Sequence, residues 1–129
     1  MRFLAFDIGT RRTGVAFLDT SVGIPLPLDT LHHTSVDVLL PLIIALIDQR
    51  KAERIIIGLP LLPSGAHGSQ SEVSKGVGTQ LLARGLDVEY VDERYTTPRN
   101  SDHKHTIPTR NLDGDASAAC ALLSGKIDC

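Results

Sequence analysis

The sequence has very few aromatic residues and few cysteines. It contains no tryptophan, and phenylalanine and tyrosine together make up 4% of the chain, so recognition of nucleic-acid bases by stacking on aromatic rings is not expected. The two cysteines, Cys120 and Cys129, offer neither a zinc-binding spacing nor a disulfide framework. Cys120 lies among alanines and is predicted to be a small core residue.

The sequence also lacks a strong charge excess and a long hydrophobic run. The net charge of -2 argues against a general basic coat, so any polyanion must be met locally, by a basic patch and bound metal. The longest apolar block, Val38 to Ile47, contains Pro41 and is too short to span a bilayer. Met1 and Arg2 lead straight into a strand pattern with no leader. We therefore expect a cytoplasmic protein with a single domain over residues 1–129.

The most informative stretch runs from Leu4 to Phe17. An apolar run ends at Asp7, turns through residues 9–14 with Arg11 and Arg12 in the bend, and resumes as a second apolar run. This pattern predicts a β-hairpin with an acid at its tip. A carboxylate at the end of a strand suits a divalent metal or a phosphate-bearing substrate. Alternatively, Asp7 only caps the turn and the first glycine supplies a positive φ. Both interpretations stay open at this point.

The order of apolar patterns predicts an α/β fold. Three strands come first and two further strands alternate with helices, which predicts a mixed five-stranded sheet: three antiparallel strands, then parallel βα units, with helices on both faces. The first strand and the β-branched fourth strand are expected to be central, and the proline-rich third strand to lie at an edge. We expect strands at Arg2–Ile8, Gly14–Asp19, Ile24–Leu31, Arg54–Leu59 and Asp87–Val91, and helices at Thr34–Arg50, Ser69–Gly85 and Asp113–Leu123.

Several local features are predicted between these elements. His32 and His33 are expected to be plain surface residues, and Pro41 to lie in the first turn of its helix. Ser69 and Glu72 have capping-box spacing. The loop over residues 65–71 is either a phosphate-binding site at the start of a helix or a simple N-cap. The pattern is lost over residues 95–112, which predicts a loop that is disordered or shaped by its substrate.

Four motifs in this order resemble the YqgF/RuvX family of the RNase H-like superfamily. That family is described as a nuclease of the precursor of small-subunit ribosomal RNA and as a Holliday junction resolvase homologue. The resemblance covers nearly the whole chain, and four ordered motifs are far more specific than any one of them. The motifs are residues 7–16, 58–60, 92–97 and 115–119.

The resemblance implies an RNase H-like fold and a nuclease with two Mg²⁺ or Mn²⁺ ions about 4 Å apart. It places the metal-binding, catalytic acids at Asp7, Glu93 and Asp115. The residue patterns favour the same positions: an acid at a strand end, an acid directly after a strand, and an acid on the buried face of the last helix. As alternatives, Asp92 is the ligand if the register differs by one residue, and Asp115 only compensates the helix dipole behind an Asp113 cap.

Basic residues flank these acids and are expected to hold phosphates on either side of the cut. For Lys104 and Arg110 a solvated loop is slightly favoured. His103 and His105 either assist proton transfer or are exposed polar residues. The candidate nucleic-acid-binding residues are Arg11, Arg12, Arg94, Arg99, Lys104 and Arg110.

The sequence departs from the resolvase pattern at two positions. The resolvase relatives have acids where this chain has Gly58 and Leu112, and Pro98 to Asn100 interrupts an expected helix. We therefore expect structured RNA rather than branched DNA as the substrate, and a monomer or weak homodimer. A junction-resolving endonuclease and an inactive nucleic-acid-binding protein remain alternatives. A sugar-kinase or actin-like ATPase would need two such domains, which 129 residues cannot supply.

Overall fold

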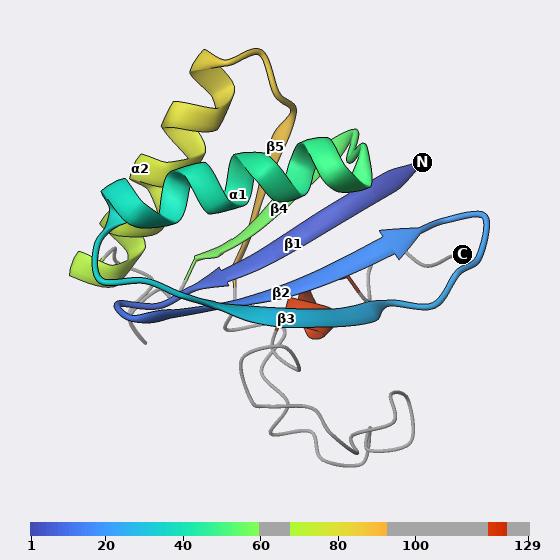
Figure 1. The fold of residues 1–129 in the computed structure, drawn as a ribbon, viewed down its shortest axis with the longest axis horizontal. Coiled ribbons are helices and arrows are strands. Elements are labelled where there is room, and N and C mark those ends of the chain that lie inside the picture. Colours follow the sequence, from blue (N-terminus) through green and yellow to red (C-terminus); the bar gives the residue numbers. More distant parts are fainter. Residues whose placement is uncertain (60–67, 93–118, 124–129) are drawn as a thin grey trace.

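The computed structural model describes residues 1–59, 68–92 and 119–123, and Figure 1 shows one twisted sheet at its centre. The five strands of these ranges lie in the order β3-β2-β1-β4-β5. β1 pairs antiparallel with β2 and β2 with β3, whereas β4 is parallel to both β1 and β5. The predicted mixed sheet is confirmed, with β1 in its middle and β3 at an edge. The strands are β1 (Arg2–Ile8), β2 (Arg12–Asp19), β3 (Leu26–His32), β4 (Arg54–Leu59) and β5 (Val88–Asp92).

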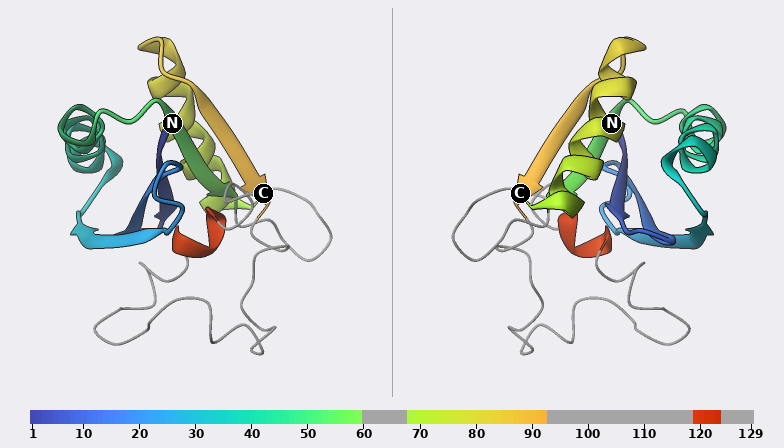
Figure 2. Two further views of the ribbon diagram at one scale, coloured as in Figure 1. Left: turned by 90° about the vertical axis from the view of Figure 1, so that its right-hand side faces the viewer. Right: turned by 90° about the vertical axis from the view of Figure 1, so that its left-hand side faces the viewer.

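Helical residues cover both faces of this sheet, as predicted (Figures 1 and 2). Because side chains alternate along a strand, Leu4 and Phe6 face one side and Phe3 and Ala5 the other. The first side packs against α1 (Val36–Arg50) and α2 (Ser69–Ala83), which lie together. The second side packs against residues 119–123. None of the helices that the structure describes is both long and apolar enough to cross a membrane.

Three predicted helix details differ from the structure. Ser35, not Thr34, caps α1, and its hydroxyl accepts a hydrogen bond from the Val38 N–H at 3.4 Å. Serine and threonine cap helices almost equally well, so the sequence could not choose between neighbours. Pro41 lies inside α1 and not in its first turn. Gly68 is the N-cap of α2, so the predicted capping box starting at Ser69 is wrong.

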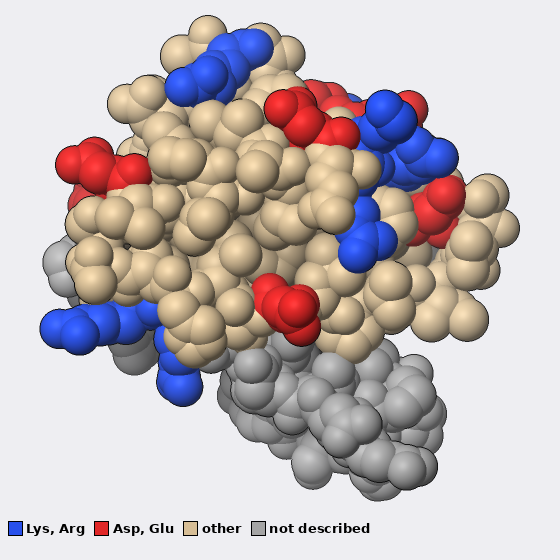
Figure 3. All heavy atoms as spheres, viewed as in Figure 1, with Lys and Arg blue, Asp and Glu red and all other residues tan. Residues whose placement is uncertain are grey.

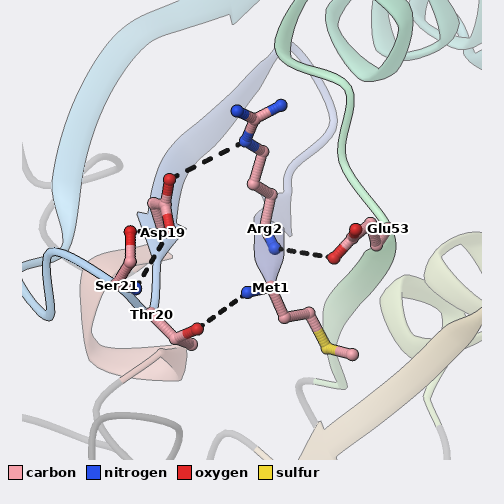
Figure 4. Close-up of polar contacts among 6 residues, drawn as sticks. All are labelled: Met1, Arg2, Asp19, Thr20, Ser21 and Glu53. Atoms are coloured by element: carbon pink, nitrogen blue, oxygen red, sulfur yellow. Dashed lines mark hydrogen bonds and ion pairs between the residues drawn. The ribbon is translucent and has the colours of Figure 1, made fainter.

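Polar contacts tie the N-terminal end of β1 to the end of β2 and to the residue that precedes β4 (Figure 4). The Met1 ammonium donates to Thr20 Oγ1 at 2.8 Å, and the backbone N–H of Arg2 donates to Glu53 Oε1 at 3.1 Å. Asp19 Oδ1 accepts from both the hydroxyl and the N–H of Ser21. These contacts lie at the opposite end of β1 from Asp7, so they secure the strand without taking part in a site there.

Asp19 gives this end of the molecule an acid-sensitive contact. The hydrogen bond from the Ser21 side chain, followed by that from its backbone, lowers the pKa of Asp19 below 3.8. Because the folded-state pKa is the lower one, its stabilisation is complete above pH 3.8 and is lost as the pH falls through the folded value. Asp19→Asn should therefore lower the melting temperature above that pH, and the difference should shrink below it. A melting temperature difference that is constant with pH would contradict this assignment.

Candidate active site

Asp7 lies inside the strand ladder and not at the hairpin tip. It is the penultimate residue of β1 and pairs with Gly14, and one further pair joins Ile8 to Thr13. The turn is therefore shorter than the predicted residues 9–14, because β2 already begins at Arg12. The Asp7 side chain is half-buried and lies near the carboxyl end of β1. A position within the ladder fixes the backbone of Asp7 more firmly than a loop would.

Gly9 closes the hairpin through a close backbone approach. Its N–H donates to the Arg12 carbonyl at 2.9 Å. A Cβ at residue 9 would lie 2.5 Å from that same oxygen, closer than real side chains come. Gly9 is not among the positive-φ glycines of the described residues. The suggested positive φ is thus wrong, and contact distance is the reason that glycine is required here.

Glycines flank Asp7 on both neighbouring strands. Gly14 is its partner on β2. On the other side, the pair of Phe6 with Ile57 places Gly58 next to Asp7 along β4. Neither neighbouring strand therefore has a side chain beside the carboxylate. Glycine inside a strand often marks a place where a ligand or another backbone approaches closely, so room beside Asp7 is left for ligands from another element.

The carboxyl ends of β1, β4 and β5 lie at the same end of the sheet, because these three strands are parallel. Asp7 has the orientation of Phe3 and Ala5, which pack against residues 119–123. Val91 of β5 pairs with Gly58, and it packs against the same cluster. Asp7 and Val91 are thus two strands apart, at the same level and on the same face.

The fit of a divalent metal can be tested on Asp7 alone. Glu93 and Asp115 lie outside the described residues, as does Asp113, and within those residues no three acidic, histidine or cysteine side chains gather as a metal site. No hydrogen bond or ion pair joins the Asp7 carboxylate to another described residue. A half-buried carboxylate of this kind offers the oxygen ligands that Mg²⁺ and Mn²⁺ prefer. Asp7 therefore fits the predicted cofactor.

Cys120 does not compete for that role. It is fully buried against the face that carries Asp7, and burial raises the pKa of its thiol to about 11. A thiol with that pKa remains protonated at neutral pH and is a poor metal ligand. The prediction that Cys120 is a core residue is confirmed.

Two of the predicted phosphate-binding residues lie at the hairpin end. Arg11 and Arg12 are both exposed, and Figure 3 shows cationic side chains at the end of the molecule where the hairpin of Figure 1 turns. The structure brings them to the same end of the sheet as Asp7. The other candidate residues, which are Arg94, Arg99, Lys104, Arg110, His103 and His105, lie outside the described residues.

Two residues near Asp7 were missed by the sequence patterns. His33 is buried, not on the surface as predicted, and its Nε2 lies 2.8 Å from Thr13 Oγ1. Burial and then the nearby His32 lower the pKa of His33, which favours its neutral form. Gln70 in the first turn of α2 donates from Nε2 to the Ile8 carbonyl at 2.7 Å. Strand alternation from Leu31 could have indicated His33, but no local pattern points to Gln70.

Comparisons with known proteins identify relatives across the whole chain. A family model described as "RuvX: Holliday junction resolvase" matches residues 1–128. A Chromobacterium violaceum protein named "Putative pre-16S rRNA nuclease" is 41% identical over 95 residues, which are 73% of this chain and 69% of that protein. An Anaeromyxobacter protein of the same name is 30% identical over 133 residues, covering 99% of this chain and 97% of the relative.

Solved structures agree with the predicted fold. A Thermus thermophilus RuvC structure aligns with a TM-score of 0.63 at 9% identity, over 95% of this chain and 90% of RuvC. RuvC in complex with a Holliday junction substrate aligns with a TM-score of 0.67 at 9% identity, over 95% and 89% of the two chains. At this identity the likeness concerns the fold alone. It confirms the RNase H-like arrangement of the sheet and helices.

Proposed function

The chain belongs to the family described as RuvX, Holliday junction resolvase, and from this premise we propose that it is a divalent-metal-dependent nuclease acting on structured RNA. Its proposed natural substrate is pre-16S rRNA, because relatives that cover most of the chain are named as nucleases of that RNA, and we propose that it cuts at the 5′ end. The observation that carries the proposal is the position of Asp7, a carboxylate between two glycines at the carboxyl end of the central strand. A cytoplasmic location stays a prediction.

We propose that Asp7, Glu93 and Asp115 together hold two Mg²⁺ or Mn²⁺ ions. Glu93 comes two residues after Val91, and Asp115 comes four residues before Ala119. Val91 and Ala119 both pack on the face that carries Asp7. A strand continued past Val91 would place Glu93 on the face of Val91, and the helix predicted over residues 113–123 would place Asp115 on the face of Ala119. Both expectations support convergence of the three acids. When bound, such ions would polarise the scissile phosphate and activate an attacking water.

The remaining tasks fall to the chain's own residues. The Asp7 carboxylate would bind the cations and offset part of their charge, and Gln70 holds the backbone directly after Asp7 through a hydrogen bond to the Ile8 carbonyl. Arg11 and Arg12 bind substrate phosphates at the hairpin end. The same role is proposed for the four basic residues of the later segment. Since the chain has no tryptophan and few other aromatics, binding reads the backbone and shape of the nucleic acid rather than its bases.

Cleavage of paired substrates tests the proposed function. A pre-16S RNA carrying its 5′ extension and a four-way DNA junction are each incubated with Mg²⁺, Mn²⁺ or EDTA. We expect metal-dependent cleavage of the RNA and little cleavage of the junction. Cleavage that continues in EDTA would overturn the metal requirement, and absence of cleavage in either metal would favour a protein that only binds nucleic acid.

Junction resolution is the second candidate, because the matching family model carries that description. Two symmetric cuts across a junction require a symmetric dimer, whereas the proposed RNA nuclease can act as a monomer or weak homodimer. Sedimentation of the protein with each substrate separates the two functions. A stable dimer that cuts only four-way junctions would replace the RNA proposal.

A further inference from the structure

We propose that Arg12 and His32 form a second phosphate-binding site of the nuclease, which extends the substrate surface from Asp7 across the hairpin to the edge strand β3. The site takes a backbone phosphate of the bound nucleic acid other than the one that is cut. The sequence patterns predicted His32 to be a plain surface residue. The inference rests on the proposed function, since it names a further contact of the same substrate.

The strand register places these two residues on the Asp7 face. Asp7 pairs with Gly14 on β2, and Arg12 lies two residues from Gly14, so the side chains of Asp7 and Arg12 share one face. His32 is the partner of Arg12 on β3, and paired residues of antiparallel strands also share a face. Asp7, Arg12 and His32 therefore stand on one face at one end of three adjacent strands.

Asp7 and His32 are far enough apart to contact different phosphates of one nucleic-acid strand. Two strand spacings separate β1 from β3, which is about 10 Å. His32 therefore lies too far from Asp7 to contact the phosphate that is cut, but near enough to contact a neighbouring one. Arg12 offers a planar fork of N–H donors for phosphate oxygens, and the exposed imidazole of His32 adds a further N–H donor.

The opposite face of the hairpin is built to hold this end in place. Thr13 and His33 are both buried, and their side chains are joined at 2.8 Å. The backbone N–H of His33 also donates to the Arg11 carbonyl at 3.0 Å. Thr13 and His33 each directly follow a member of the proposed pair in the chain. The buried contact thus fixes the backbone of Arg12 and His32, so they are held in place before a phosphate arrives.

The charge pattern of β3 limits the site to the hairpin end. Asp29 is exposed three residues before His32, about 10 Å back along the strand. Its negative charge disfavours a phosphate path along the whole edge strand. The nucleic acid is therefore expected to leave the sheet near His32 and not to follow β3 toward Leu26.

Binding measurements on four variants test the site. Each protein is titrated in EDTA into a fluorescein-labelled RNA hairpin, and the dissociation constant is read by fluorescence anisotropy. His32→Glu should weaken binding about tenfold, Arg12→Glu by at least as much, and His32→Arg should tighten binding, in line with the usual effect of phosphate contacts. Gln49→Glu is the matched control, because it adds the same charge at an exposed position near the far end of α1.

The outcomes separate this inference from the proposed function. Equal affinities of His32→Glu and Gln49→Glu, with Arg12→Glu still weakened, would overturn the role of His32 and leave the nuclease intact. If the unsubstituted protein does not bind the RNA hairpin, both proposals are overturned. Because His32 is exposed, its substitutions should leave the melting temperature unchanged. If His32→Glu and His32→Arg instead melt earlier and bind RNA equally weakly, His32 has a structural role and the phosphate site is overturned.

Discussion

Asp7→Asn is expected to reduce metal-dependent cleavage of RNA by about 10³-fold, the range seen when a charge-stabilising group is removed from an active site. Asparagine has nearly the same shape but carries no charge, so it weakens the hold on divalent cations without creating a cavity. The carboxylate is half-buried and has no partner among the described residues. Its removal should therefore cost little stability. Cleavage rates at saturating Mn²⁺ and melting temperatures measure the two effects separately.

Asp48→Asn provides the control for this experiment. Asp48 is an exposed acid near the end of α1, so its substitution removes the same charge on the other face of the sheet, away from the proposed metal site and substrate surface. We expect its cleavage rate to stay within about twofold of the unsubstituted protein, as for exposed charges in general. RNA binding in EDTA should survive Asp7→Asn. Unchanged cleavage by that variant would remove Asp7 from the catalytic centre, whatever role Glu93 and Asp115 have.

Elements with a continuous pattern were predicted with the greatest success. The predicted bounds of β1 and β4 agree with the structure residue for residue, because each is an apolar run that ends at a clear change in composition. β5 is shifted by one residue, since its predicted and observed ends both include polar residues that fit either register. Helix starts depended on single side chains, and a neighbouring serine or glycine took the place of the predicted cap at both α1 and α2.

The candidate site could be predicted only in part. The position of Asp7 after an apolar run, with glycines following it, is enough to indicate an acid near the end of a strand. The glycine on each side of Asp7 depends on which strands become neighbours, and the sequence does not state that. The sequence shows Gly58 only as the loss of a ligand, whereas in the sheet it also clears the space beside Asp7. The pairing register between strands that are distant in the sequence decides which residues lie beside Asp7, and local sequence patterns do not predict that register.

A pair of glycines in α2 shows how a single contact can reverse the effect of one substitution. Gly76 and Gly78 both lie inside α2, where glycine is less favourable than alanine. At Gly76 an added Cβ would meet nothing within 4 Å, but at Gly78 it would overlap the hydroxyl oxygen of Tyr90 and lie 2.7 Å from its ring. Tyr90 lies on β5 and donates to the Lys75 carbonyl at 3.4 Å. Gly78 therefore allows α2 to pack closely against β5.

Gly78→Ala should accordingly lower the free energy of unfolding by about 2 kcal/mol, the usual cost of inserting a methyl group into a packed contact. Gly76→Ala should raise it by up to about 1 kcal/mol, because alanine favours a helix and this position has room. Urea denaturation measures both values. In a Tyr90→Leu background the penalty at Gly78 should largely disappear; an equal penalty in both backgrounds would locate the clash elsewhere. Because β5 ends directly before Glu93, a displaced Tyr90 should also slow cleavage, whereas Gly76→Ala should not.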